Sequence, residues 1–250
     1  MSSLQTTSPG RRHDAAGALF RLDIFSDLIC PWCYIGKRRL EAALPVLADE
    51  GLRFEVTWRP FQLNPAMPAE GLDRRTYRSA KFGSWEKSEA LDAQVADAGA
   101  GDGIAFRHAL MARTPNTVAS HALLRFAHGA GGSALQGRLI EALFAAYFTQ
   151  GRDVGDLSVL ADLGAEAGLR RDEVVSYLTD PASRDAVLLE EKLARDLCLN
   201  GVPSVAIDGY VLFSGAQPTP AIVRVLRQAA AELLARRAAA AGEASTHAGS

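Results

Sequence analysis

The sequence predicts an α/β fold in which two distant parts of the chain build one small sheet. Three observations lead to this prediction. A strand, a helix and a second strand follow one another in residues 20–58. Residues 70–199 show helical patterns and no convincing strand. Two short strands joined by a tight turn, and then a last helix, follow in residues 205–237. We therefore expect one composite domain with a helical insertion between the two halves of its sheet.

The first half of the sheet is predicted to be a βαβ unit with a parallel strand pair. Residues 20–26 and 52–58 alternate between apolar and polar side chains, as half-buried strands do. The helix between them, residues 31–50, carries on one face Leu40, Leu44 and Leu47. Pro45 predicts a kink or break in this helix, and Gly51 is a suitable residue to end it.

The insertion is predicted to contain several helices. Residues 72–98 are rich in charge and only weakly periodic, whereas residues 135–148 form the clearest amphipathic pattern in the chain. The aromatic residues of that pattern, which we expect in the core of the insertion rather than in a substrate groove, are Phe144, Tyr147 and Phe148. Asn116 is a candidate cap for a helix over residues 117–128.

Further aspartates are predicted to cap the later helices. Asp156 and Asp172 are expected to cap two short helices, and Asp180 followed by Pro181 is expected to start a long one. One face of that long helix carries Ala186, Leu189, Leu193 and Leu197.

The second half of the sheet follows the insertion. Residues 205–207 and 210–213 read as strands joined by Asp208-Gly209, a hairpin turn pair. A last helix is expected over residues 220–237. This order of elements predicts a thioredoxin-like fold. The predicted parts are a disordered lead-in at 1–18, a thioredoxin-like domain at 19–68 and 182–238, a helical insertion at 69–181, and a disordered tail at 239–250.

The motif Cys30-Pro31-Trp32-Cys33 lies where the first strand turns into the first helix. Backbone N–H groups at a helix N-terminus favour a negative charge, so Cys30 is placed to act as a thiolate nucleophile. Cys33 lies one turn further on, within reach of a mixed disulfide on Cys30. Half of a zinc site or two buried thiols remain alternatives. Zinc normally takes four ligands, and no second motif of this kind follows, although two protomers could share a site.

Val202-Pro203 precedes a strand in the second half of the chain, at a loop that lies beside the dithiol in a thioredoxin-like fold. A cis peptide bond is expected here, which would turn the Val202 backbone outward to pair with a substrate segment held near Cys30. A trans proline in an ordinary turn is the alternative.

Composition excludes several classes of partner. The chain has 250 residues, 48% hydrophobic and 22% charged, with a net charge of −2, so it has no basic field for nucleic acid or membranes. No apolar run is long enough to span a bilayer. Residues 1–17 lack the apolar segment of a secretory signal, and three cysteines make no disulfide framework. We expect a cytoplasmic protein without a metal or prosthetic group.

Several spaced motifs resemble one known family. These are residues 26–37 around the dithiol, Pro60 to Pro65, Pro115-Asn116-Thr117 with His121, and Gly201-Val202-Pro203 with residues 214–217. They are similar to DsbA-family oxidoreductases of the FrnE-like group over residues 20–235. The resemblance implies thiol–disulfide exchange on protein or small thiol substrates. It makes Cys30 the attacking thiol, Cys33 the resolving thiol and Pro203 the cis proline. We expect the substrate to contact Pro31, Trp32, Val202, Asn116 and His121.

Two other functions compete with this one. Isomerases of 2-hydroxychromene-2-carboxylate and kappa-class glutathione transferases share the fold, but they carry serine where this sequence has Cys30. Asn116 and His121 fall in a stretch that those enzymes use near substrate, and glutathione is a candidate co-substrate. A helix cap and a satisfied helix-face residue are the structural alternatives for these two positions. A non-catalytic chaperone-like binding module is the third function. The sequence leaves open whether the protein is a monomer or a homodimer.

Cys198 stands where the family usually has a helix-ending glycine, and a passive thiol is the expected interpretation. Lys37 and Arg38 are expected to be solvated, so that no cation lies beside the Cys30 sulfur. The predicted redox potential is therefore more reducing than the roughly −120 mV of DsbA.

Overall fold

The computed structural model describes residues 18–196, 199 and 201–247. Most of the predicted lead-in, and Cys198, lie outside the described residues. The main sheet has four strands in the order β2-β1-β5-β6. They are β1 (Ala18–Ser26), β2 (Leu52–Pro60), β5 (Ser204–Ile207) and β6 (Tyr210–Ser214).

The pairing of the strands confirms the predicted fold. β1 and β2 are parallel, with Ala18 opposite Leu52 and Ser26 opposite Pro60. β5 pairs with β1 and with β6 in antiparallel fashion. The β5–β6 turn has positive φ angles at Asp208 (48°) and at the glycine after it (81°), as the predicted hairpin requires. The chain thus forms a thioredoxin-like fold with a mixed sheet.

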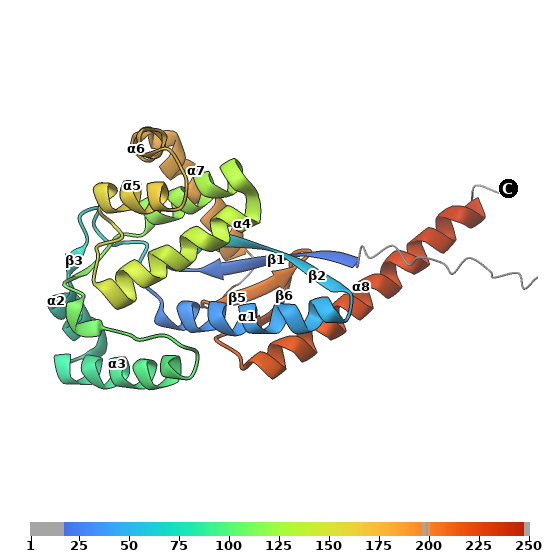
Figure 1. Ribbon diagram of the computed structural model, residues 1–250, viewed down its shortest axis with the longest axis horizontal. Coiled ribbons are helices and arrows are strands. Elements are labelled where there is room, and N and C mark those ends of the chain that lie inside the picture. Colours follow the sequence, from blue (N-terminus) through green and yellow to red (C-terminus); the bar gives the residue numbers. More distant parts are fainter. Residues whose placement is uncertain (1–17, 197–198, 200, 248–250) are drawn as a thin grey trace, which may run out of the picture.

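Helices cover both faces of the sheet. Figure 1 shows α1 (Pro31–Asp49) and α8 (Thr219–His247) on one side, and α4 (Val118–Gln150) and α7 (Pro181–Asp196) on the other. The core between these layers includes fully buried Leu22, Ile35, Leu47, Leu139 and Leu226. Because α1 is held along its length by this core, its first turn is fixed at the edge of the sheet.

The insertion between the two halves of the sheet runs from α2 to α7. Its other helices are α2 (Arg74–Phe82), α3 (Trp85–Ala100), α5 (Leu157–Glu166) and α6 (Arg171–Thr179). The expectation that this region has no strand is wrong in one detail. β3 (Leu72–Asp73) and β4 (Arg113–Thr114) pair as a two-stranded ribbon, too short to give an alternating pattern. Figure 1 shows α2, α3 and β3 grouped beside the N-terminal end of α1.

α4 consists of two helical segments that meet at Gly131 and Gly132, which have non-helical backbone angles. Gly132 has a φ of 63°, a conformation that glycine adopts at no steric cost. The two segments correspond to the two helices predicted on either side of this point. Phe144, Tyr147 and Phe148 are buried in the second segment, as predicted. The expectation that they do not line a groove is wrong for Tyr147 and Phe148, because both form part of the wall of a pocket described below.

Three expectations about helices are wrong. α1 continues through Pro45: the Glu41 carbonyl loses its usual donor, but buried Ala43 and Leu47 hold the last turn against the core. Asp172 lies in the first turn of α6 and pairs with the N-cap residue, Arg170, instead of capping. α8 extends to His247, beyond the predicted end at 237.

The face of α7 that carries Leu189 and Leu193 does not pack against the core. This face is exposed, with Leu189 at 62% and Leu193 at 60% of full exposure. The buried face instead includes Val187, Glu191 and Ala194. Glu191 is turned inward because its carboxylate accepts a hydrogen bond from the Gln62 backbone N–H (2.9 Å). The need to satisfy the buried Gln62 N–H explains why the Glu191 face of α7 points inward.

Candidate active site

The dithiol lies at the N-terminus of α1. Cys30 is the N-cap residue, with φ −93° and ψ 109°, and Pro31 follows inside the first turn. The Cys33 N–H donates to the Cys30 carbonyl (3.0 Å), so the first turn brings the two cysteines together. Both are free thiols. Cys30 is 4% exposed and Cys33 is completely buried, so a substrate meets the Cys30 sulfur first.

The two thiols are electrostatically different. Burial raises the pKa of Cys33 well above its usual value, and the nearby Cys30 sulfur raises it further. The Ser26 hydroxyl and the Asp27 backbone, which lie beside the Cys33 sulfur, act in the opposite direction and lower the pKa. Cys33 is therefore a protonated thiol near neutral pH.

The Val202-Pro203 peptide bond is cis, as predicted. The Cys30 thiol donates to the Val202 carbonyl (3.7 Å), so this loop lies directly against the Cys30 sulfur. The loop is held from behind: the Gly215 N–H donates to the Pro203 carbonyl (2.7 Å), and the Ser204 hydroxyl donates to the Gly201 carbonyl (2.7 Å). Segments far apart in the sequence thus meet at Cys30.

α1 is joined to the same loop by close packing. A Cβ atom added at Gly36 would lie 3.0 Å from Pro203 Cγ, so only glycine lets the helix approach the loop this closely. Arg39 donates to the Ala216 carbonyl (2.7 Å), and the Thr219 hydroxyl donates to the Arg39 carbonyl (3.2 Å). These contacts fix the distance between the dithiol helix and the cis-proline loop.

The expectation that Lys37 is solvated is wrong. Its side chain is 2% exposed, and its ammonium lies 2.6 Å from Glu141 and 2.7 Å from Glu41. Arg38 pairs with the same Glu141 carboxylate (2.5 Å). The aliphatic part of Lys37 can be buried because two carboxylates neutralise its charge.

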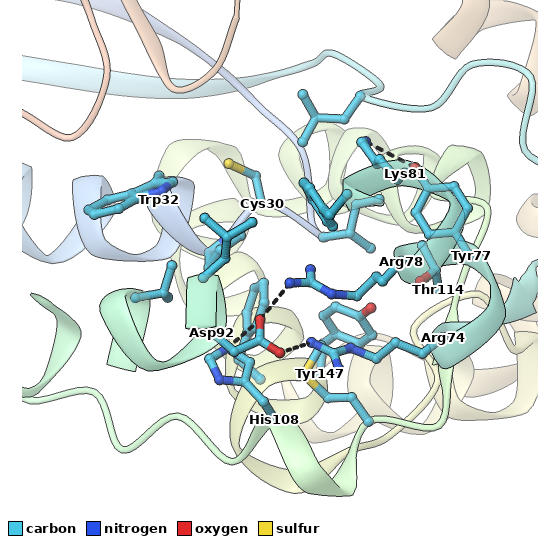
Figure 2. A pocket seen from close by; sticks show the side chains of 18 of the residues that line it. Cys30, Trp32, Arg74, Tyr77, Arg78, Lys81, Asp92, His108, Thr114 and Tyr147 are labelled. Carbon is cyan, nitrogen blue, oxygen red and sulfur yellow. Dashed lines mark hydrogen bonds and ion pairs between the residues drawn. The ribbon is translucent and has the colours of Figure 1, made fainter. Parts of the chain in front are cut away.

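A pocket of about 270 Å³ opens beside Cys30. The dithiol motif contributes Cys30, Pro31 and Trp32, and the insertion contributes residues of α2, α3 and α4. Trp32 is 41% exposed at the edge of this pocket, and the buried rings of Tyr147 and Phe148 form part of its wall. Figure 2 shows Cys30 and Trp32 on one side of the pocket and the charged residues of α2 opposite them.

A charged cluster in the wall of the pocket was not predicted. Arg74 and Arg78 each lie 2.7 Å from the Asp92 carboxylate, which is shared between them. Arg74 is 3% exposed and Asp92 is 8% exposed. Figure 2 shows the Asp92 carboxylate between the two guanidinium groups, with His108 beside it. The only sequence signal was that residues 72–98 are rich in charge and weakly periodic, which does not show that any of the charges are buried together.

His108 completes this cluster. Its Nε2 atom lies 3.9 Å from Asp92 and has no hydrogen-bond partner among the described residues. Burial lowers the pKa of His108; Asp92 raises it, and the positive charges of Arg74 and Arg78 lower it further. His108 is therefore neutral at neutral pH.

Asn64 connects a third cation, Lys81, to the pocket. Its Oδ1 atom accepts hydrogen bonds from the Lys81 ammonium (2.9 Å) and from the Tyr77 hydroxyl. Lys81 also donates to the Tyr77 hydroxyl (2.9 Å). Asn64 belongs to the predicted motif from Pro60 to Pro65, so that motif supplies part of the pocket wall.

Asn116 and His121 lie elsewhere. Asn116 accepts from the Val118 N–H (3.0 Å) at the start of α4 and donates to the Met67 carbonyl (2.8 Å). His121 is buried, with its Nε2 atom 3.5 Å from the Asp27 carboxylate. Neither residue lines the pocket beside Cys30. Their predicted contact with substrate stays a prediction.

Asp27 links His121 to the active-site strand. Its carboxylate is fully buried and accepts from the Leu63 N–H (2.7 Å). This bond holds the segment after β2 against the turn that leads into Cys30.

The described part of the chain shows no group of three or more His, Cys, Asp or Glu side chains placed to hold a metal ion. None of its helices has both the length and the apolar character needed to cross a bilayer.

A model of the DSBA-like thioredoxin domain matches residues 21–227. The chain belongs to this family. Among solved structures, this DSBA-like chain is similar to a probable DsbA oxidoreductase from Streptomyces coelicolor, with 34% identity and a TM-score of 0.75 over 85% of this chain and 91% of the other. A 2-hydroxychromene-2-carboxylate isomerase is 17% identical, with a TM-score of 0.63 over 87% of this chain and 98% of the isomerase, which shows a shared fold.

Among curated proteins, the DSBA-like chain is similar to the uncharacterized protein YwbO of Bacillus subtilis. The two are 28% identical over 149 residues, which is 59% of this chain and 66% of YwbO. The match therefore spans slightly less than two thirds of that relative.

Proposed function

We propose that this DSBA-like protein is a thiol–disulfide oxidoreductase or isomerase of the FrnE-like group. One observation carries the proposal: Cys30 is the N-cap residue of α1 and lines a pocket, its thiol faces the Val202 carbonyl, and Cys33 is buried one turn behind it. Only the first sulfur is placed to meet a substrate, and only the second is placed to displace what the first has bound.

The exchange takes two steps. The Cys30 thiolate attacks one sulfur of a substrate disulfide, forming a mixed disulfide and releasing the other sulfur as a thiolate. Cys33 then loses its proton and attacks the Cys30 sulfur, forming the Cys30–Cys33 disulfide and releasing the second substrate thiolate. The substrate gains two electrons, and the enzyme dithiol loses them. The same steps in reverse introduce a disulfide into a dithiol substrate. In the forward direction, a thiol or dithiol reduces the Cys30–Cys33 disulfide and returns the enzyme to its starting state.

Several roles belong to the proposal. Pro203 and the Val202 backbone present an edge along which an extended substrate segment can pair next to Cys30. Pro31 and Trp32 contact the substrate at the pocket. Protein disulfides and small disulfides are the substrates, glutathione is a candidate co-substrate, and the site of action is the cytoplasm, where a pair of catalytic cysteines stays reduced between turnovers.

Insulin reduction and refolding of scrambled ribonuclease test the proposal. Wild type is expected to catalyse at least one of these reactions, and Cys30→Ser is expected to lose it. Cys198→Ala is the matched control, because it removes the third thiol of the chain and is expected to leave the rate unchanged. Absence of both reactions in the wild type would contradict the proposal.

One observation favours a second function. The pocket beside Cys30 has walls of apolar side chains such as Leu63, Phe82 and Val95, which suit a small aromatic compound. A glutathione-dependent isomerase or transferase would use this wall. Isomerase activity that survives in Cys30→Ser would support that function, and a chaperone-like binding module would show neither activity.

A further inference from the structure

The pocket beside Cys30 carries an excess of positive charge. Its wall contains the cations Arg74, Arg78 and Lys81, and Asp92 is the one carboxylate among the described residues that line it. Asp92 is already shared by both guanidinium groups. Lys81 donates to the neutral acceptors Asn64 and Tyr77, so its charge is not balanced by them.

The surroundings make this charge effective. Arg74 and Asp92 are buried, and the pocket wall around them is mainly apolar, so water screens the charges in this part of the wall weakly, whereas Lys81 lies on the exposed edge of α2. Arg78 stays charged even though burial lowers the pKa of its guanidinium, because an arginine pKa is far above neutral. Neutral His108 leaves a buried ring nitrogen without a protein partner beside the same cluster.

The size of the pocket limits what can enter. Its volume of about 270 Å³ is just below the range of about 300–1,000 Å³ that is usual for drug-sized ligands. An amino-acid-sized group fits this volume, whereas a folded protein surface does not enter it. Cys30 lines the pocket, so a disulfide whose carboxylate binds in the pocket has its sulfur atoms close to the Cys30 sulfur.

Resting on the exchange reaction proposed above, we propose that this pocket binds the carboxylate of a small disulfide, with Arg78 and Lys81 as the groups that select it. The protein then prefers acidic low-molecular-weight disulfides to neutral or basic ones. Arg74 and Asp92 act as positioning residues, because they hold the Arg78 guanidinium at the pocket wall.

The reaction with an acidic disulfide needs no reactant besides the disulfide and the enzyme dithiol. Cys30 attacks the acidic disulfide and releases one carboxylate-bearing thiolate, while the other half remains bound as a mixed disulfide with its carboxylate in the pocket. Cys33 then releases that half and closes the Cys30–Cys33 disulfide. The two electrons come from the enzyme dithiol, so one turnover of the reduced protein needs no external reductant.

Single-turnover rates on the reduced protein test the proposal with three probes. These are 3,3′-dithiodipropionate, which is anionic, bis(2-hydroxyethyl) disulfide, which is neutral, and cystamine, which is cationic. Each rate is divided by the rate of the same probe with dithiothreitol, which corrects for intrinsic reactivity. We expect the anionic probe to react at least about tenfold faster than the neutral one, and cystamine to react slowest.

Substitutions of the pocket cations test whether these residues cause the preference for the anionic probe. Arg78→Gln and Lys81→Met are each expected to lower the corrected rate for the anionic probe by about tenfold and to leave the neutral probe unchanged. Arg224→Gln removes the same charge from an exposed position on α8 outside the pocket, and is expected to change neither rate. If Arg78→Gln also slows the neutral probe, the substitution has disturbed the fold of the variant. Lys81→Met, on the exposed edge of α2, then decides whether the pocket selects the anionic probe.

The outcomes separate the two proposals. Equal corrected rates for all three probes, or an anionic preference that survives in Lys81→Met and Arg78→Gln, would overturn the carboxylate site while leaving disulfide exchange intact. No reaction with any probe would instead overturn the proposed function.

Discussion

Replacing Gly36 by alanine tests whether the close approach of α1 to the cis-proline loop matters for exchange. The added Cβ would lie 3.0 Å from Pro203 Cγ and 3.7 Å from Ala216 Cα. Carbon atoms in ordinary contact are about 3.5–4.0 Å apart, so Pro203 must move by about half an ångström or more. Pro203 is held by its hydrogen bond from Gly215 (2.7 Å), and the strain therefore falls on the loop that faces Cys30.

The expected change in stability is small because two terms oppose each other. Alanine in a helix interior is favoured over glycine by about 0.8–1.0 kcal/mol. Overpacking typically costs about 1–3 kcal/mol. The free energy of unfolding of Gly36→Ala should therefore fall by about 0–2 kcal/mol, which denaturant titration measures.

The expected change in rate is larger. A misplacement of about 1 Å at a reacting centre can cost about a hundredfold in rate, so half that displacement should cost about tenfold. Single-turnover reaction of the reduced protein with a neutral disulfide measures it. Gly137→Ala is the control: an added Cβ there meets nothing within 4 Å, so we expect gain of stability and an unchanged rate. A Gly36→Ala protein that reacts as fast as wild type would refute the idea that this contact positions the loop.

Three further predictions concern the charges and thiols near the dithiol. Glu141→Ala removes a carboxylate partner of buried Lys37 and should lower the free energy of unfolding by about 2–3 kcal/mol. The control, Glu173→Ala at an exposed ion pair, should change it by less than about 0.5 kcal/mol, and equal losses would contradict this expectation. Burial raises the pKa of Cys33, so its thiol stabilises the reduced fold below about pH 8.5, and this contribution is lost as pH rises toward the raised pKa. Denaturation at pH 7 and pH 9.5 should therefore show a larger loss for wild type than for Cys33→Ala, and identical losses would argue against it. The Cys30 sulfur faces a carbonyl rather than a cation, so redox titration should give a potential more reducing than about −120 mV, and a value at or above that would be contrary to expectation.

The sequence was most informative where local pattern and chemistry agree. Alternation in residues 20–26 and 52–58 and the turn pair Asp208-Gly209 are local signals, and each has its counterpart in the structure. The same holds for Cys30 as a helix cap, because the turn from strand to helix is itself local.

Features that depend on tertiary packing could not be predicted in this way. Lys37 looked like a surface lysine because Glu141, its partner, is 104 residues away in the sequence. The cluster of Arg74, Arg78 and Asp92 forms only when α2 packs on α3, so the charge of residues 72–98 could not by itself reveal it. The apolar face of α7 is exposed because Glu191 is needed inside, which leucine periodicity cannot reveal.

Trapping the mixed disulfide tests the central account most directly. Cys33→Ser and Cys30→Ser are each incubated with bis(2-hydroxyethyl) disulfide, and intact-protein mass spectrometry with peptide mapping locates the adduct. We expect Cys33→Ser to accumulate one mercaptoethanol adduct on Cys30, because the sulfur that would release it is gone, and we expect Cys30→Ser to form none on Cys33, which is completely buried. An adduct that forms on Cys33 as readily as on Cys30 would contradict the assignment of an attacking and a resolving thiol.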